Sequence, residues 1–144
     1  MAGRYFEDFE VGEKIFGKGI TITETHVVQF AGITGDFHPL NTNEEHAKKT
    51  QWGKRIVHGL LTACMAIPEL GNIVSDTAVA HTKDIFNYTA PVFFGDTIQP
   101  EFEITGLEQK KHWGKVSIKL VVKNQKGDVV VDGSSEVLVN KRPE

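Results

Sequence analysis

Residues 58–74 read HGLLTACMAIPELGNIV, a run in which apolar side chains would occupy nearly every face of a helix. Such a helix is stable only when other parts of the protein surround it. Pro68 lacks an N–H group and should kink the helix, and the pair Gly71-Asn72 marks its end. The sequence therefore predicts a buried helix over residues 58–74.

After about residue 78 the hydrophobic pattern changes to a period of two, which is typical of strands with one buried face. The segment KNQKGDVVV at residues 123–131 indicates a tight hairpin turn. We expect strands at about residues 78–89, 97–108, 113–124 and 128–140. With a first strand at residues 14–23, they predict an α+β fold in which an antiparallel sheet covers the buried helix.

Two further helices are expected before the buried one. Thr23 can cap a helix that runs to Thr34 and stops at Gly35. Thr42-x-x-Glu45 resembles a capping box, with acidic residues in the first turn of a short helix and lysines in the last. The chain between these two helices should therefore be a loop.

This loop carries a carboxylate, an imidazole and a carboxamide within six positions, at Asp36, His38 and Asn41. Pro39 fixes its own φ and disfavours helical geometry at the residue before it. We therefore expect the three side chains on an extended, stiff loop and not on a helix. Polar groups on such a loop can converge on one small volume.

Length and composition are those of an ordinary globular protein. A chain of 144 residues, 40% hydrophobic and 24% charged, is expected to form one domain over residues 1–144. The formal charge of −3 argues against a nucleic-acid binder, because phosphate contacts need a concentrated positive surface. The N-terminus lacks the apolar core of a signal peptide, and no apolar run reaches the roughly 18 residues of a membrane span. Cys64 is the single cysteine, so a reduced, cytoplasmic setting is expected.

Several kinds of site find little support in the sequence. Asp36-x-His38 offers two metal ligands where zinc needs three or four, so no metal site is expected. The chain has neither a Gly-x-Ser-x-Gly elbow nor a Gly-x-Gly-x-x-Gly or Walker pattern, so neither a serine hydrolase nor a nucleotide cofactor is indicated. Cys64 belongs to the apolar helix, where a thiol is a poor nucleophile.

A resemblance to the MaoC-like dehydratases rests on residues 35–41, which read Gly-Asp-Phe-His-Pro-Leu-Asn. This family, also called hydratase-2 or (R)-specific enoyl-CoA hydratases, has the pattern Gly-Asp-x-Asn-Pro-hydrophobic-His, so its Asn and His are exchanged here. The likeness continues through residues 42–50 and 55–59 and returns at residues 90–92 and 95–97. It covers nearly the whole chain. It implies the hot-dog fold, a curved sheet around one central helix, and a dimer or larger assembly with the active site at the subunit interface.

The activity implied by this resemblance is the reversible hydration of a 2-enoyl-CoA to an (R)-3-hydroxyacyl-CoA, by a hydro-lyase without metal or redox cofactor. The reaction needs a base for water, an acid for the α-carbon and a donor for the enolate oxygen. On this hypothesis Asp36 activates water and His38 donates and accepts the proton. Gly59, at the start of the buried helix, offers its N–H to the thioester carbonyl. Asn41 orients water or substrate, because an amide is not a general base at neutral pH.

The resemblance also suggests contacts to the acyl-CoA thioester at His58 and Thr62. Positive charge gathers nearby, and this cluster is either a solvated face or a contact for the phosphates of coenzyme A. Its members are Lys48, Lys49, Lys54 and Arg55.

Two other functions stay open. A hot-dog domain can act as a thioesterase when a carboxylate directs water to the carbonyl and not to the β-carbon. A non-catalytic acyl-CoA-binding domain is the third reading, because Asn41 stands where the family has its histidine. Acyl-carrier-protein thioesters are alternative substrates. The pairing of Asp36 with a nearby imidazole favours hydration.

Overall fold

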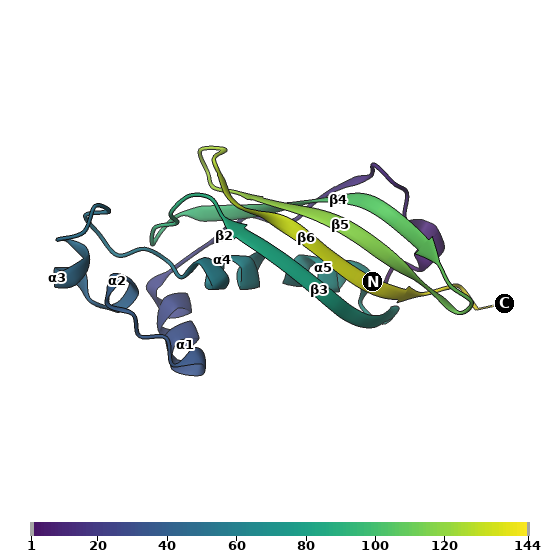
Figure 1. The fold of residues 1–144 in the computed structure, drawn as a ribbon, viewed down its shortest axis with the longest axis horizontal. Helices are drawn as coiled ribbons and strands as arrows, with labels where there is room; N and C mark the ends of the chain where they lie inside the picture. Colours follow the sequence, from purple (N-terminus) through teal and green to yellow (C-terminus); the bar gives the residue numbers. More distant parts are fainter. Residues whose placement is uncertain (1, 144) are drawn as a thin grey trace.

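A computed structural model describes residues 2–143 (Figure 1). Over these residues a six-stranded antiparallel sheet has the order β1-β4-β5-β6-β3, and β2 pairs with β4 beside β1. The strands are β1 (Lys14–Phe16), β2 (Ile20–Thr21), β3 (Ala78–Tyr88), β4 (Thr97–Gln109), β5 (Trp113–Lys123) and β6 (Val129–Asn140). The four expected C-terminal strands are thus confirmed to within a few residues at their ends.

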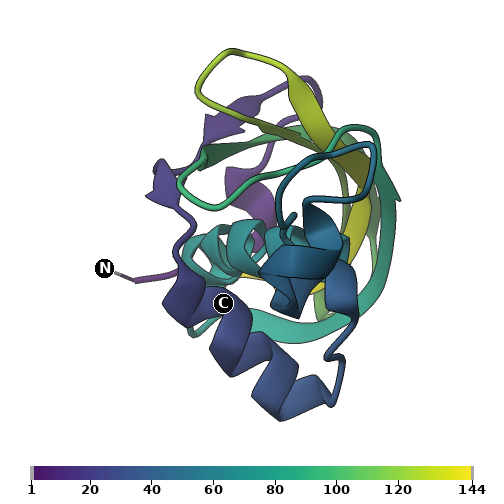
Figure 2. The same ribbon diagram turned by 90° about the vertical axis from the view of Figure 1, so that its left-hand side faces the viewer.

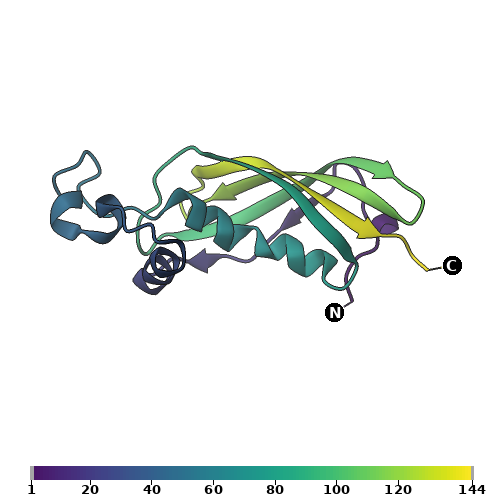
Figure 3. The same cartoon turned by 60° about the horizontal axis from the view of Figure 1, so that its bottom comes forward.

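The sheet curves around two consecutive helices, α4 (Gly59–Ala66) and α5 (Pro68–Val74), as Figures 2 and 3 show. Ala66 and Leu70 are almost fully buried in one core cluster with strand residues such as Phe102 and Leu120, and Ala63 is also buried. Burial of each large apolar side chain contributes about 1.5–3 kcal/mol. The expected kink is present as a break at Ile67, after which Pro68 begins the second helix.

The remaining helices precede α4 in the chain. After the short 3-10 helix η1 (Phe6–Asp8), α1 (Glu24–Thr34) begins after Thr23 and ends at Gly35, as expected. Gly35 has a φ of 76°, a left-handed conformation that glycine adopts without strain. Figure 1 shows α1, α2 and α3 gathered at one end of the sheet. Within residues 2–143, no helix combines the length and apolar character needed to cross a bilayer.

The expected strand over residues 14–23 is wrong in one respect, because it is interrupted between β1 and β2. Gly17 lies opposite Pro100 of β4 and donates its N–H to the Pro100 carbonyl at 2.9 Å. Pro100 has no N–H to return, and the Gln99 side-chain amide instead donates to the Gly17 carbonyl at 2.9 Å. A proline far along the chain therefore ends regular pairing here.

The expected extended loop is also partly wrong. Residues 39–42 form a single helical turn, α2 (Pro39–Thr42), so Asn41 lies on a helix. Proline fits the first position of a helix, and the His38 ring caps this one by accepting the Leu40 N–H at its Nδ1, 3.2 Å away. His38 itself keeps an extended backbone, with φ −55° and ψ 132°, as expected before a proline, and the helical turn begins only at Pro39.

The capping box expected at Thr42 is absent. The next helix is α3 (Glu44–Ala47), and its cap is Asn43, whose Oδ1 accepts the His46 N–H at 3.0 Å. Thr42 instead donates its hydroxyl to the carbonyls of Phe37 and His38, each at 3.0 Å. Thr42 is the last residue of α2, which places its hydroxyl back toward the previous turn.

Candidate active site

Asp36 follows the glycine that ends α1, and its side chain is 54% exposed. Its backbone N–H donates to the Thr34 hydroxyl at 3.2 Å, and its Oδ1 accepts the backbone N–H of His38 at 3.3 Å. The carboxylate is thus held by its neighbours in an open position, where a substrate or water can reach it.

His38 is exposed, and its backbone lies beside the Asp36 carboxylate. Because its Nδ1 accepts the Leu40 N–H, a neutral His38 ring carries its proton on Nε2. The ring can therefore donate a hydrogen bond from Nε2 while it caps α2.

Asn41 is directed into the protein. It is 7% exposed, and its Nδ2 donates to the Ile56 carbonyl at 2.7 Å. Ile56 in turn donates its N–H to the Leu40 carbonyl at 3.3 Å. The backbone N–H of Asn41 donates to the His38 carbonyl at 2.9 Å, but among the described residues no hydrogen bond joins the Asn41 side chain to Asp36 or to the His38 ring. The structure therefore gives Asn41 a bracing contact between α2 and the segment that leads to α4.

The imidazole that faces Asp36 from across the fold is His58, the N-cap residue of α4. Its Nε2 lies 3.0 Å from the Asp36 carbonyl oxygen and 3.9 Å from Oδ2 of the same residue. The ring is 5% exposed and packs on Phe30 of α1, with ring centroids 4.9 Å apart. Sequence reasoning treated His58 as a substrate contact and missed this pairing, because the motif alone does not show that residues 22 positions apart meet.

Gly59 opens α4 directly below the ring of Tyr88. A Cβ atom at this position would lie 2.8–2.9 Å from Tyr88 ring atoms, so only glycine allows the ring to cover the helix start. Partial burial raises the pKa of the Tyr88 phenol, and nearby Cys64 adds to the shift. The Tyr88 ring thus covers the first turn of α4.

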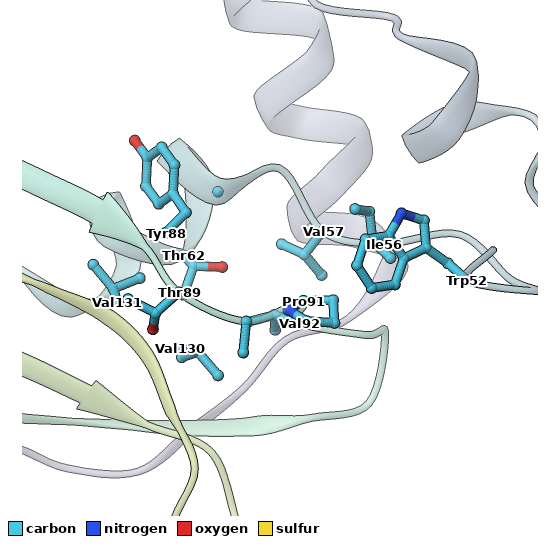
Figure 4. A pocket seen from close by; sticks show the side chains of 12 residues that line it. Trp52, Ile56, Val57, Thr62, Tyr88, Thr89, Pro91, Val92, Val130 and Val131 are labelled. Atoms are coloured by element: carbon cyan, nitrogen blue, oxygen red, sulfur yellow. The ribbon is translucent and has the colours of Figure 1, made fainter. Parts of the chain in front are cut away.

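Beside Gly59 lies a cavity of about 300 Å³, shown in Figure 4. Apolar side chains dominate its wall, and the buried Thr62 brings a hydroxyl to it. Asp36 and His38 do not line this cavity. The lining residues are Trp52, Ile56, Val57, Gly59, Thr62, Tyr88, Thr89, Ala90, Pro91, Val92, Val130 and Val131.

Arg55 of the basic cluster is already paired. Its guanidinium contacts Glu24 of α1 at 2.8 and 3.1 Å and Glu44 of α3 at 2.8 Å, and its Cζ lies 4.5 Å from the centre of the Phe94 ring. The bond to Glu24 raises the pKa of Arg55 and lowers that of the Glu24 carboxyl. Arg55 therefore joins α1 to α3 across the site. A phosphate would have to compete with two carboxylates for it.

The lysines of this cluster differ in their contacts. Lys48 pairs with Glu45 at 2.8 Å, and the Lys54 ammonium lies 4.2 Å from the centre of the Phe93 ring. Across residues 2–143, no three His, Cys, Asp or Glu side chains are grouped closely enough to hold a metal ion.

Comparison with known proteins identifies the family of this chain. A family model described as a MaoC like domain matches residues 8–126. The chain is 35% identical over 141 residues to the 3-hydroxybutyryl-CoA dehydratase of Methylorubrum extorquens, covering 97% of this chain and 87% of that protein. It is 31% identical over 138 residues to the (R)-specific enoyl-CoA hydratase of Rhodospirillum rubrum, covering 96% and 93% respectively.

Solved structures give the same answer for the fold. The monoamine oxidase regulatory protein from Archaeoglobus fulgius superimposes with a TM-score of 0.91 and 37% identity, covering 99% of this chain and 98% of that one. The Mycobacterium tuberculosis protein Rv0216, described as having a double hot-dog fold, gives 0.88 at 18% identity over 99% of this chain and 46% of that one. The fold is therefore of the hot-dog class. The chain belongs to the MaoC-like dehydratase family and is an enzyme of the hydro-lyase class.

Proposed function

We propose that this enzyme catalyses the reversible hydration of a 2-enoyl-CoA to an (R)-3-hydroxyacyl-CoA. The observation that carries the proposal is the Asp36 carboxylate held beside the His58 ring at the start of α4, whose first residue, Gly59, also lines the apolar cavity. A base, a helix N-terminus and an apolar pocket are the parts that the addition of water to an enoyl thioester needs. The names of the hydratase and dehydratase relatives support the same reaction.

In the proposed hydration Asp36 takes a proton from water while the water oxygen bonds to the β-carbon. The electron pair of the double bond moves toward the thioester, and the Gly59 N–H stabilises the enolate oxygen. The proton returns from Asp36 to the α-carbon, so the overall addition balances. His38 holds the water by donating from Nε2, because its Nδ1 is occupied by the Leu40 N–H.

We further propose that residues 1–144 act as one cytoplasmic domain that assembles as a homodimer or larger homo-oligomer. Support comes from β3, an outer strand of the sheet that exposes Val79, Ile85 and Tyr88. An outer strand offers unpaired backbone groups to a second copy. Acyl-CoA thioesters are the proposed substrates, and acyl-carrier-protein thioesters are the alternative.

The test uses purified protein with crotonyl-CoA, following loss of the ultraviolet band of the conjugated thioester. Asp36→Asn should lower kcat by about 10²–10⁴-fold, the range for loss of a general base, and His38→Ala should have a smaller effect. His46→Gln, a change on the exposed face of α3, is the control and should behave as the wild type.

Product analysis separates hydration from its rivals. Formation of 3-hydroxybutyryl-CoA without free CoA supports the proposal, whereas free CoA would favour a thioesterase. Tight binding without turnover of crotonyl-CoA or of longer and branched enoyl-CoAs would favour a binding domain, in line with Asn41 at the family's histidine position.

A further inference from the structure

We propose that His58 is a positioning residue, which fixes the backbone of Asp36 and thereby the direction of its carboxylate. This inference rests on the hydration reaction proposed above. It assigns to a buried imidazole a role distinct from that of a substrate contact or of the exposed His38.

The first step is the direction of the hydrogen bond. Nε2 of His58 lies 3.0 Å from the Asp36 carbonyl oxygen, and a carbonyl oxygen can only accept. Nε2 therefore carries the proton and donates it. In the neutral ring this leaves Nδ1 as an acceptor.

The second step is the state of that Nδ1 atom. It is the single buried side-chain nitrogen or oxygen without a hydrogen-bond partner among residues 2–143. An unpaired buried polar atom costs about 1–3 kcal/mol, which an apolar side chain of similar size would avoid. Packing against Phe30 therefore does not explain an imidazole here, whereas the bond from Nε2 to Asp36 does.

The third step is the separation along the sequence between Asp36 and its hydrogen-bond partners. The hydrogen bonds to Thr34 and His38 each span two positions, so they shape the turn but do not place it relative to α4. The bond from His58 spans 22 positions and starts at the N-cap of α4, one residue before Gly59. Among the hydrogen bonds of Asp36 in the described structure, only this one connects Asp36 to the start of α4, where Gly59 is the proposed donor to the enolate oxygen.

Removal of the hydrogen bond from His58 to Asp36 should lower the rate of hydration. A misplacement of about 1 Å in a reacting group can cost about 10²-fold in rate. Because the carboxylate is proposed to act on water and the α-carbon, its displacement should lower kcat while KM changes little. Loss of a substrate contact would instead raise KM.

The experiment compares three substitutions at His58. The terminal nitrogen of glutamine is separated from Cα by the same number of bonds as Nε2 of histidine. The side-chain amide of His58→Gln can therefore still donate to the Asp36 carbonyl. His58→Asn places its nitrogen one bond short, and His58→Leu keeps an apolar contact with Phe30 but has no donor. His46→Gln again serves as the matched control on an exposed histidine.

We expect His58→Gln to stay within about threefold of the wild-type kcat, and His58→Asn and His58→Leu to lose about 10–100-fold in kcat with KM within about threefold. Melting curves establish that each variant is folded. Equal activity of His58→Leu and His58→Gln, or a rise in KM at constant kcat, would overturn the proposal.

A second readout does not depend on turnover. Two-dimensional ¹H–¹⁵N spectra of the imidazole rings should show His58 protonated at Nε2, and His58→Leu should shift the backbone amide signals of residues 36–38 more than those of α3. Protonation at Nδ1 alone would overturn the inference. If the wild type hydrates no enoyl-CoA, the proposed function fails, while these spectra still decide whether His58 holds Asp36.

Discussion

At the scale of single residues, Asp36 and Asn41 share one short segment but have opposite surroundings. Asp36 exposes more than half of its side chain, whereas Asn41 is buried and donates to the Ile56 carbonyl. Position 41, where the family has its histidine, therefore has a bracing contact in this chain. The imidazole that contacts Asp36 comes from His58 instead, and His38 contacts the Asp36 carboxylate through its backbone N–H.

Substitution of Asn41 separates bracing from catalysis. Asn41→Ala should lower the free energy of unfolding by about 1–2 kcal/mol, because the Ile56 carbonyl loses its donor. Urea denaturation measures this change, and Asn72→Ala, on an exposed position of α5, should alter stability little. Unchanged stability together with lost hydratase activity would instead favour the sequence-based prediction that Asn41 orients water or substrate.

Cys64 gives a prediction about pH. Partial burial raises the pKa of its thiol, and the charge of Asp84 adds to the shift. A raised pKa leaves less thiolate at neutral pH, and the thiolate is the reactive form. Alkylation by iodoacetamide should therefore be slower at pH 7 in the folded protein than in urea, and should accelerate as the pH rises through the raised pKa. Equal rates in both states at pH 7 would contradict this.

At the scale of elements, long periodic segments could be predicted from sequence and short ones could not. The alternation in β4 to β6 and the apolar run of α4 and α5 depend on side chains within each segment. In contrast, α2 depends on a cap from His38, and the break between β1 and β2 depends on Pro100 and Gln99. The sequence predicts that Asp36 and the start of α4 belong to the active site, and this stays a prediction. It did not show that His58 joins them, because that contact depends on the folded loop.

Substitution of two glycines by alanine would show how closely β3 and β6 pack. A Cβ at Gly133 of β6 would lie 1.8 Å from the Ile85 carbonyl oxygen of β3, which is backbone and does not move aside. Gly133→Ala should therefore destabilise the protein by more than about 3 kcal/mol. Gly32 of α1 has open space at its Cβ position, so Gly32→Ala should stabilise by about 0.5–1 kcal/mol. Urea denaturation of both variants is the measurement, and similar stabilities would contradict the close β3–β6 approach.

At the scale of the whole molecule, the sheet orients α4, and the helices at one end of the sheet hold the segment that carries Asp36. The sheet buries α4 and α5 and so fixes the direction in which the start of α4 points. Arg55 then joins α1 and α3, which border the segment that carries Asp36, through its contacts with Glu24 and Glu44. The sheet and helices thus hold an exposed segment that carries Asp36. Another part of the protein must cover this segment if bulk water is to be kept from the reacting groups.

A second copy of the chain is the cover that we propose, and β3 is the strand through which it would bind. Ile85 is 45% exposed on this outer strand. A lysine there would place charge in the contact, so Ile85→Lys should convert a dimer to a monomer in light scattering coupled to size-exclusion chromatography. Hydratase activity should fall with it if the active site lies at the interface.

The matched control for the dimer is Val11→Lys. Val11 is 63% exposed and precedes β1, at the opposite side of the sheet from β3, so the added charge there should leave the mass and the activity unchanged. A wild-type protein that is monomeric and fully active would refute both the assembly and the shared site. An Ile85→Lys monomer with full activity would keep the dimer but place the whole site within one chain, and Asp36, His58 and Gly59 would then have to control water without a partner.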